Sequence, residues 1–277
     1  MSIQSFLNVE KSNHIYYEKV ETADTSTAII FLHGLCGSRR QWHKQYKDLS
    51  KKHTLYFIDL LGFGFSAKPD IPYTLQTHVE ALHTFIQKHV KEKSIILIGH
   101  SFGAIVSLAY LQKYPKEINK TFLLSLPYFL SSKEAMSHLK ANYKPQYFVV
   151  DSWFLKLTCK VWCHYGGPIT RKINPYIYKN LPKEVASDGS LHTYNSYITS
   201  LYNVIYNQDI KSLLTRNISK KIFLLHANND KLAPFSNIKI LSENYNLPLH
   251  VIKNGTHEFP FNGENDAYRL LSKLLKI

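Results

Sequence analysis

A serine flanked by glycines is the part of this sequence whose residue types and spacing most clearly support chemistry. The segment Gly99-His100-Ser101-Phe102-Gly103 follows the apolar run Ile95–Ile98 and precedes a stretch with helical spacing, Ala104–Lys113. A strand-to-helix turn of this kind lifts the serine hydroxyl out of the sheet, and the small residues around it let strand and helix approach closely. The helix N-terminus favours the negative charge that develops when a hydroxyl attacks a carbonyl. This context predicts that Ser101 is a nucleophile.

Short apolar runs are the elements that must position this serine. Several, such as Ile29–Leu32 and Ile95–Ile98, are apolar at every position, which is typical of parallel strands covered on both faces. The alternation of such runs with helical spacing predicts an α/β fold with a mostly parallel twisted sheet and helices on both faces. The predicted strands are His14–Val20, Thr27–Leu32, His53–Ile58, Ser94–Ile98, Thr121–Leu126, Lys221–Leu225 and Leu249–Ile252, and the predicted helices are Thr77–Lys91, Ala104–Lys113 and Ala267–Leu275.

The alternation stops after the strand predicted to end at Leu126. Residues 128–205 are rich in aromatic side chains, have helical spacing and contain no strand-like run. We predict that they form a helical cap inserted into a core domain made of residues 1–127 and 206–277. Most of the aromatic side chains are expected to pack inside the cap rather than to bind a ligand.

The segment around Ser101 resembles the nucleophile turn of the α/β-hydrolase superfamily, and the resemblance extends from about Ile15 to the C-terminus. The run His33-Gly34-Leu35-Cys36-Gly37-Ser38 is similar to the loop of that family that faces the nucleophile. The resemblance implies that the Leu35 and Phe102 N–H groups form an oxyanion hole. It also implies that His33, which taken alone is a candidate base, has a structural role.

The segment Asp59-Leu-Leu-Gly62-Phe-Gly64-Phe-Ser66 resembles a second turn of the same family. Taken alone, Gly62-x-Gly64-x-x-Ala67 also resembles a dinucleotide-binding fingerprint, which requires a helix to begin at that point. Two prolines, Pro69 and Pro72, follow instead and oppose a helix. We therefore expect a structural turn here and no bound cofactor.

Two further segments resemble the parts of the family that carry an acid and a histidine. Asp230 follows a late predicted strand, although Ala227 stands where the family commonly has glycine, and His257 follows the last predicted strand. The other position where the family can carry its acid, Ser125-Leu126-Pro127, holds no carboxylate. The chain order Ser101, Asp230, His257 is the order of this fold. The resemblance implies a triad in which His257 is the general base and Asp230 orients it.

These features favour a serine hydrolase of the carboxylesterase type. We expect it to cleave an ester or thioester of a small to medium apolar acyl group through an acyl-enzyme. Two other enzymatic readings stay open: a C–C bond hydrolase, which Glu258 directly after His257 disfavours, and an esterase or thioesterase acting on an acyl carrier protein. A reading of another class is a ligand receptor or signalling protein on the same fold.

The charge of the chain bears on its partners. The 34 Lys and Arg against 20 Asp and Glu give a net charge of +14, but the basic residues are scattered as singles and pairs. Nucleic-acid binding proteins usually cluster them, so we expect a solvated basic surface and no nucleic-acid partner. The expected partner is a small-molecule ester, and the charge is also compatible with an anionic substrate or an acyl carrier protein.

Cysteine usage and the N-terminal residues bear on the compartment. An odd number of cysteines, Cys36, Cys159 and Cys163, favours a reducing compartment. Cys159, Cys163 and His164 have the spacing to share a helix face, but nothing nearby completes a metal site, so we expect no metal. The N-terminal residues lack the pattern of a secretory signal, and no apolar run has bilayer-spanning length. We therefore expect a cytoplasmic protein with no membrane span.

Overall fold

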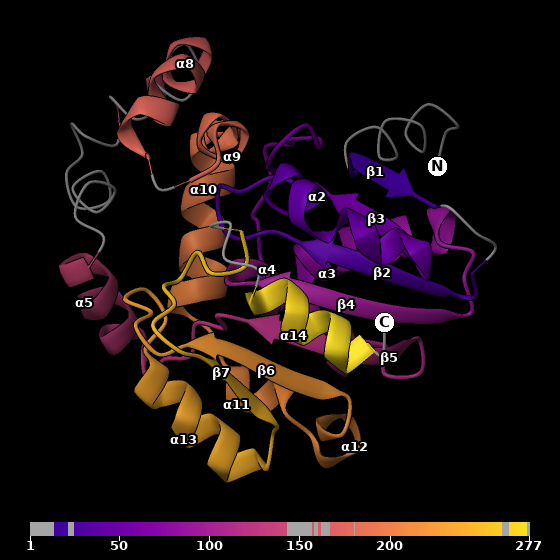
Figure 1. Ribbon diagram of the computed structural model, residues 1–277. Coiled ribbons are helices and arrows are strands. Elements are labelled where there is room, and N and C mark those ends of the chain that lie inside the picture. Colours follow the sequence, from indigo (N-terminus) through magenta and orange to yellow (C-terminus); the bar gives the residue numbers. More distant parts are fainter. Residues whose placement is uncertain are drawn as a thin grey trace, which may run out of the picture.

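A seven-stranded sheet forms the centre of the protein (Figure 1). The computed structural model describes residues 14–21, 25–142, 157, 160–161, 167–179, 181–261 and 266–275. The strand order is β1-β3-β2-β4-β5-β6-β7, and β1 pairs antiparallel with β3 while the other pairs are parallel. The predicted α/β fold with a mostly parallel sheet is confirmed. The strands are β1 (Tyr17–Val20), β2 (Thr27–Leu32), β3 (Thr54–Ile58), β4 (Ser94–His100), β5 (Ile118–Leu124), β6 (Ile222–Ala227) and β7 (Leu249–Ile252).

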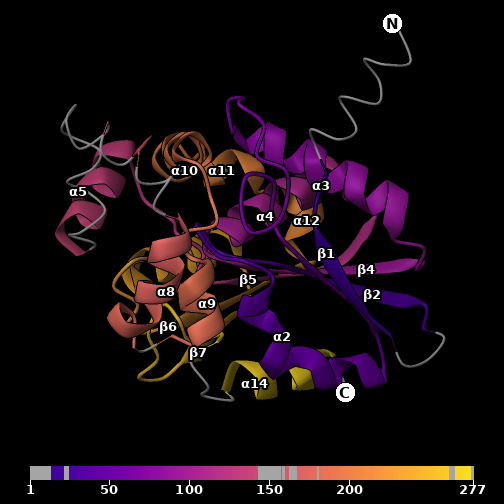
Figure 2. The same cartoon turned by 90° about the horizontal axis from the view of Figure 1, so that it is seen from above.

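Both faces of the sheet are covered by helices because its central strands are apolar on both sides. Successive residues of a strand point to opposite faces, and in β2 Ile29 packs into one core while Ile30 packs into the other. Helices α3 (Leu75–His89) and α4 (Phe102–Lys113) cover one face (Figure 2). Helices α2 (Arg40–Tyr46) and α14 (Asp266–Leu275) cover the other (Figure 2).

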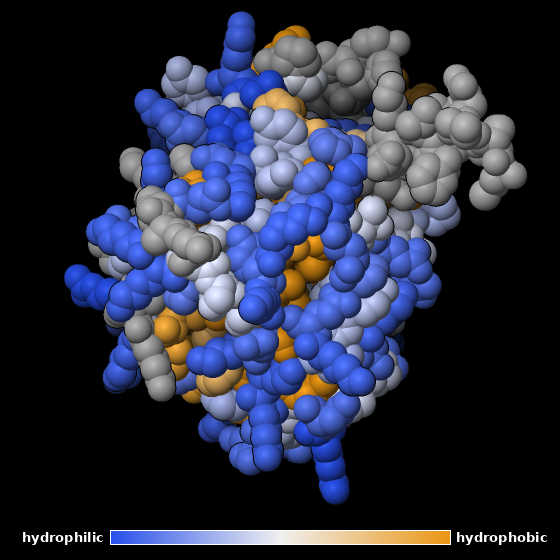
Figure 3. Space-filling view, turned by 90° about the vertical axis from the view of Figure 1, so that its right-hand side faces the viewer, coloured by the Kyte–Doolittle hydropathy of each residue, from blue (hydrophilic) through white to orange (hydrophobic). Residues whose placement is uncertain are grey.

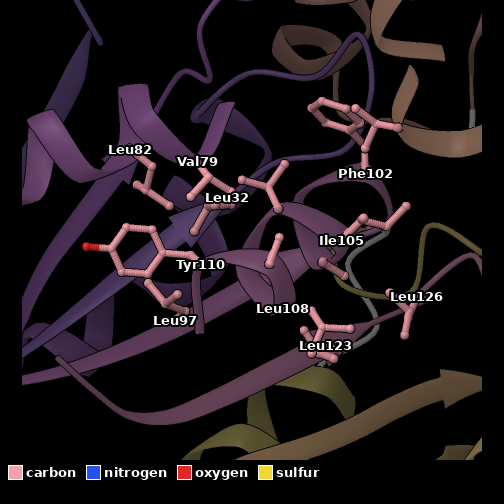
Figure 4. Close-up of a cluster of buried hydrophobic side chains, with 14 of the residues drawn as sticks. Leu32, Val79, Leu82, Leu97, Phe102, Ile105, Leu108, Tyr110, Leu123 and Leu126 are labelled. Atoms are coloured by element: carbon pink, nitrogen blue, oxygen red, sulfur yellow. The ribbon is translucent and has the colours of Figure 1, made fainter. Parts of the chain in front are cut away.

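The core between α3, α4 and the sheet fixes the helix that starts at the predicted nucleophile. Side chains of α4 pack between those of α3 and those of the strands (Figure 4). Ten residues of α4 are buried, so this helix has no solvent-facing stripe over most of its length. The cluster includes Leu32, Val79, Leu82, Leu97, Phe102, Ile105, Leu108, Tyr110, Leu123 and Leu126.

The seven predicted strands are all present, but several predicted boundaries are wrong. The strand predicted over Thr121–Leu126 runs from Ile118 to Leu124, because Ser125 leaves the extended conformation with a φ of 47°. The strand predicted to end at Ile98 continues to His100, and the helix predicted to begin at Ala104 begins at Phe102. Strand and helix therefore meet at a single residue, Ser101.

Two helices that cover the sheet were not predicted. Helix α13 (Phe235–Tyr245) follows β6, and α2 has only seven residues. Trp42 and Tyr46 of α2 lie one turn apart and pack against Phe31 with ring centroids 5.4 Å and 5.5 Å away. Short helices are marginal alone and are stabilised by packing of this kind, so local spacing gave little signal for α2.

Helices fill the described residues between β5 and β6. These are α5 (Ser132–Asn142), α8 (Gly167–Ile177), α9 (Lys183–Asp188), α10 (Tyr194–Ser200), the π-helical η2 (Leu201–Tyr206), α11 (Ile210–Leu213) and α12 (Arg216–Ser219). The division into a core domain of residues 1–127 and 206–277 and a helical cap of residues 128–205 stays a prediction. Cys159, Cys163 and His164 lie outside the described residues. Among the helices that the structure describes, none is both long and apolar enough to cross a membrane.

Candidate active site

Ser101 lies in a turn that forces its backbone into a conformation rarely adopted by residues other than glycine. Its φ is 52° and its ψ is −117°. The turn is held by hydrogen bonds from the Ser101 N–H to the Leu124 carbonyl, at 2.8 Å, and from the Ala104 N–H to the Ser101 carbonyl, at 2.9 Å. Strained backbone of this kind costs about 1–3 kcal/mol and clusters at functional sites. Ser101 is only half-buried, so its surroundings do not seal it in the core.

Glycines on both sides of Ser101 let β4, α4 and β2 pack against one another. A Cβ on Gly103 would lie 2.5 Å from the Leu32 carbonyl oxygen and 2.6 Å from the His33 carbonyl oxygen. A Cβ on Gly99 would collide with the backbone of Gly103. The need for small residues at these two positions, which the sequence pattern predicted, is thus explained by backbone approach.

The loop after β2 lies directly against Ser101. A Cβ on Gly34 would lie 3.5 Å from the Ser101 Cβ, and the loop turns back on itself through a hydrogen bond from the Gly37 N–H to the Gly34 carbonyl, at 2.9 Å. Leu35 follows Gly34 in this turn. Phe102 is the first residue of α4, where N–H groups have no intrahelical acceptor. Phe102 thus follows Ser101 directly and the loop that contains Leu35 approaches Ser101 at Gly34, while the oxyanion hole stays a prediction.

Asp230 and His257 form a buried pair at the carboxyl ends of β6 and β7. The His257 Nδ1–H donates to the Asp230 carboxylate, 2.9 Å from Oδ1 and 2.8 Å from Oδ2. Asp230 Oδ1 also accepts from the N–H groups of Leu232 and Ala233, at 2.9 Å and 2.8 Å. Because a carboxylate only accepts, the proton is assigned to Nδ1, which leaves Nε2 of His257 able to accept a proton.

The charges of this pair shift both of its pKa values. Burial alone would raise the pKa of Asp230, but the charge and hydrogen bond of His257, with His226 and the Ala233 N–H, hold that pKa well below its usual range. Burial lowers the pKa of His257, but Asp230 and Glu258 together raise it above the ordinary value of 6.5. The arrangement stabilises a protonated imidazole beside an ionised carboxylate, as a general base requires once it has taken up a proton.

Backbone contacts between the two loops fix the pair. The Asn229 N–H donates to the Gly255 carbonyl at 3.2 Å, and the Asn254 N–H donates to Asn228 Oδ1 at 2.7 Å. A Cβ on Gly255 would lie 2.9 Å from Ile252 Cγ2, so this turn has no room for a side chain. The loop that carries the acid and the loop that carries the histidine therefore behave as one unit.

His100 links this unit to the nucleophile turn. Its Nε2 lies 2.9 Å from the His257 carbonyl, and its ring centroid lies 4.8 Å from that of His257. The structure thus brings Asp230 and His257 into direct contact and places His257 against the neighbour of Ser101. Within the part of the chain that the structure describes, no hydrogen bond joins Ser101 Oγ to His257.

Gln41 is a residue of this site that the sequence did not reveal. Its side chain lies between Gly34 and His100: Oε1 is 3.3 Å from the Gly34 N–H nitrogen and Nε2 is 2.8 Å from His100 Nδ1. Because the His257 carbonyl can only accept, His100 Nε2 carries the proton, Nδ1 accepts, and the orientation of the Gln41 amide follows. Burial lowers the pKa of His100 well below 6.5, which keeps it in this neutral form.

His33 is buried and its two ring nitrogens both contact the backbone. Nε2 accepts from the Leu60 N–H at 2.9 Å, and Nδ1 lies 2.7 Å from the Gly34 carbonyl. Burial lowers the pKa of His33. These contacts agree with the structural role that the resemblance implied, since neither nitrogen is left for a substrate.

The turn after β3 is structural, as predicted. Asp59 accepts from the N–H groups of Arg39, at 2.6 Å, and Phe65, at 2.8 Å, and pairs with the Arg39 guanidinium at 3.0 Å. Gly64 has a φ of 54°, and a Cβ there would collide with the Asp59 carboxylate. No helix begins between β3 and α3, all of which the structure describes. The turn therefore lacks the helix that a dinucleotide-binding fingerprint requires.

A buried carboxylate joins helix α9 to the loop that faces Ser101. Asp188, at the end of α9, accepts from Ser38 Oγ at 2.7 Å and from Arg40 Nε at 2.6 Å, and it also pairs with the Arg40 Nη2. Arg171 of α8 lies 3.9 Å from the same carboxylate. Asp188 was not predicted as part of the site, and its contacts span about half of the chain.

Comparisons with known proteins agree with this architecture. Residues 27–151 match the family model described as the alpha/beta hydrolase fold. A crystal structure of E-2-(acetamidomethylene)succinate hydrolase has a TM-score of 0.71 at 16% identity, and the match covers 95% of this chain and all of that one. The chain therefore has the α/β-hydrolase fold, in agreement with the resemblance found in the sequence. The structure of an esterase from Exiguobacterium antarcticum is similar at a TM-score of 0.69 and 18% identity, over 95% of this chain and 96% of that chain.

Among curated proteins, the chain is similar to "Probable lysophospholipase BODYGUARD 4" of Arabidopsis thaliana. The two are 29% identical over 229 residues, which cover 76% of this chain and 54% of that protein. The chain thus spans about half the length of the curated relatives it matches. In the described residues, no cluster of three or more His, Cys, Asp or Glu side chains is arranged to hold a metal ion.

Proposed function

We propose that the chain is a serine hydrolase that cleaves carboxylic esters of apolar acyl groups through an acyl-enzyme. The observation that carries this proposal is the buried Asp230–His257 pair, whose histidine lies against the turn that strains Ser101. The names of the similar proteins, an esterase and a "Probable lysophospholipase", support an ester substrate.

In the proposed reaction, Ser101 Oγ attacks the ester carbonyl carbon while His257 Nε2 takes up the hydroxyl proton. The oxyanion receives hydrogen bonds from the Leu35 and Phe102 N–H groups, and losing one such donor typically costs about 10²–10³ in rate. The protonated His257, stabilised by Asp230, then gives its proton to the departing alcohol. Water repeats the steps on the acyl-enzyme, which releases the acid and restores Ser101.

A substrate panel with active-site labelling tests the proposal. We expect a fluorophosphonate probe to label the wild type, and p-nitrophenyl esters or thioesters, free or carrier-bound, to be turned over repeatedly. Ser101→Ala should abolish both results. Ser137→Ala is the matched control, because Ser137 is exposed on α5 and donates only to the Glu134 carbonyl.

The outcomes separate the proposal from its alternatives. Labelling without turnover of any acyl ester would favour a receptor that keeps the fold, and turnover equal in wild type and Ser101→Ala would remove Ser101 from the reaction. Salt-sensitive activity confined to carrier-bound esters would instead point to an acyl carrier protein as partner.

A further inference from the structure

Helix α8 carries its apolar side chains on its outer face. Ile169, Ile173, Tyr176 and Ile177 are 54%, 45%, 78% and 64% exposed. They are spaced by four, three and one residues, so they share one face of the helix. A helix on a protein surface usually has the opposite arrangement, with its apolar stripe toward the core.

The inner face of the same helix is polar. Thr170, Arg171 and Asn174 are half-buried. Arg171 lies 3.9 Å from Asp188, and a Cβ on Gly189 would lie 3.9 Å from Asn174 Nδ2. Helix α8 is therefore seated on α9 by polar groups, and this seating leaves the apolar side chains facing out.

Exposed apolar side chains concentrate in this part of the chain. Thirteen large apolar side chains are exposed among the described residues, and seven of them lie between residues 157 and 178: Leu157, Val161, Ile169, Ile173, Tyr176, Ile177 and Tyr178. The face on the right-hand side of Figure 1, away from α8, is mostly hydrophilic with short apolar stretches between polar side chains (Figure 3). Large exposed apolar patches rimmed by polar residues mark interaction surfaces.

We propose that the outer face of α8 docks on an anionic lipid surface. Amphipathic helices that lie in the interface of a bilayer have an apolar face and basic residues beside it. Helix α8 contains the exposed Lys172 and no acidic residue, and the exposed Lys179 follows it. Juxtamembrane basic residues contribute about 1 kcal/mol each toward an anionic leaflet.

Charge also favours lipid over a second copy of the chain. Two α8 faces brought together would place Lys172 and Lys179 near their counterparts, on molecules that each carry a net charge of +14. Like charges in a contact oppose association, whereas an anionic leaflet attracts the same groups. The docking proposal goes beyond the proposed function and does not depend on it. Only its corollary, that the ester substrate resides in the lipid surface, rests on the proposed function.

Vesicle co-sedimentation of the full chain tests the docking. The wild type is expected to bind phosphatidylcholine vesicles that contain phosphatidylglycerol, and to bind less as salt screens the charges. The double substitution Ile173→Glu and Ile177→Glu should lower the vesicle partition coefficient by about tenfold or more, because it removes two apolar side chains from the docked face. Ile240→Glu on α13 is the matched control, since Ile240 is 41% exposed far from α8 (Figure 1).

Each remaining outcome overturns the docking proposal. Vesicle binding that is unchanged in the double variant, or that is absent in the wild type, would refute the docking directly. A dimer in sedimentation velocity that the double variant dissociates would show that a second copy covers the face. A fall in the melting temperature of the double variant would show that the protein itself covers it.

The same variants keep the docking apart from the proposed catalysis. Ser101→Ala should bind vesicles as the wild type does, and the double α8 variant should hydrolyse a soluble p-nitrophenyl ester with unchanged kcat/KM. Vesicle binding without Ser101-dependent hydrolysis would leave docking intact and refute the proposed function. Ser101-dependent hydrolysis without vesicle binding would refute the docking and leave the proposed function intact.

Discussion

Replacing Gln41 with leucine removes the side chain that joins the Gly34 loop to His100, and it does so without a large change of volume. Gln41 is 5% exposed, so the two groups it contacts have no ready access to water. A buried polar group left without a partner costs about 1–3 kcal/mol. The hydrogen bond from the Gly34 N–H to Gln41 Oε1 is long, at 3.3 Å, so its loss is expected to cost an amount at the lower end of this range. Together with the loss of the His100 partner, the free energy of unfolding should fall by about 2–4 kcal/mol.

The same substitution should also slow the proposed reaction. Gly34 precedes Leu35, whose N–H is a proposed oxyanion donor, and His100 holds the carbonyl of His257. Leucine at position 41 removes neither the Leu35 N–H nor His257, but it removes contacts that hold both in position. A misplacement of about 1 Å typically costs about 10²-fold in rate. We therefore expect kcat to fall by about 10- to 100-fold with little change in KM.

The assay is steady-state kinetics on a soluble ester, combined with thermal unfolding of the same preparations. Gln76→Leu is the control, because Gln76 is exposed on α3 and donates to Glu80 at 2.6 Å; it should change neither quantity. A Gln41→Leu protein that melts earlier but keeps its kcat would show that Gln41 only stabilises the fold. Unchanged kcat and melting temperature together would refute the assigned hydrogen bonds.

Two further substitutions probe the charges of the site. Asp230→Asn removes the charge that raises the pKa of His257. Because the proposed base His257 must be neutral to take up a proton, activity is expected to fall as pH drops through this pKa. The acid limb of the kcat/KM profile should therefore move to lower pH in the variant, while kcat falls by about 10⁴-fold. An acid limb that stays in place would contradict the assignment. Asp188→Asn leaves the Arg40 guanidinium without its anionic partner. Because Arg40 is 31% exposed and can reach water, we expect the free energy of unfolding to fall by about 1–2 kcal/mol, which is less than for breaking a fully buried ion pair. Asp48→Asn, in an exposed pair with Lys51, should leave the melting temperature unchanged.

The strands could be predicted because each carries its signal locally. Runs such as Ile29–Leu32 are apolar at every position, and that property holds whatever the strand pairs with. Strand ends were less predictable, since the end of β5 depends on the left-handed turn at Ser125. Helix α2 was missed because its stability comes from Trp42 and Tyr46 packing on Phe31, a contact that its seven residues do not encode by themselves.

The proposed triad residues could be named from the sequence, but the residues that hold them in position could not. A motif marks Ser101 because its turn needs glycines at fixed spacing, and chain order marks Asp230 and His257. The partners that hold them are single residues with no pattern around them: Gln41 meets His100 across 59 positions, and Ser38 meets Asp188 across 150. Sequence spacing carries no signal over such distances, so only the fold reveals these pairs.

The segment from His33 to Gln41 makes these distant contacts, and they are expected to affect catalysis. Its residues form hydrogen bonds with the turn after β3, the nucleophile turn and helix α9 through four partners: Leu60, Asp59, His100 and Asp188. Leu35 lies in the middle of this segment, so the position of a proposed oxyanion donor is set from three sides of the protein. Since an oxyanion donor acts mainly in the transition state, damage at any of these contacts should appear in kcat before it appears in KM. A substitution at Asp188, at the end of α9, is therefore expected to affect the proposed reaction through Ser38 and the loop, and not only through substrate binding.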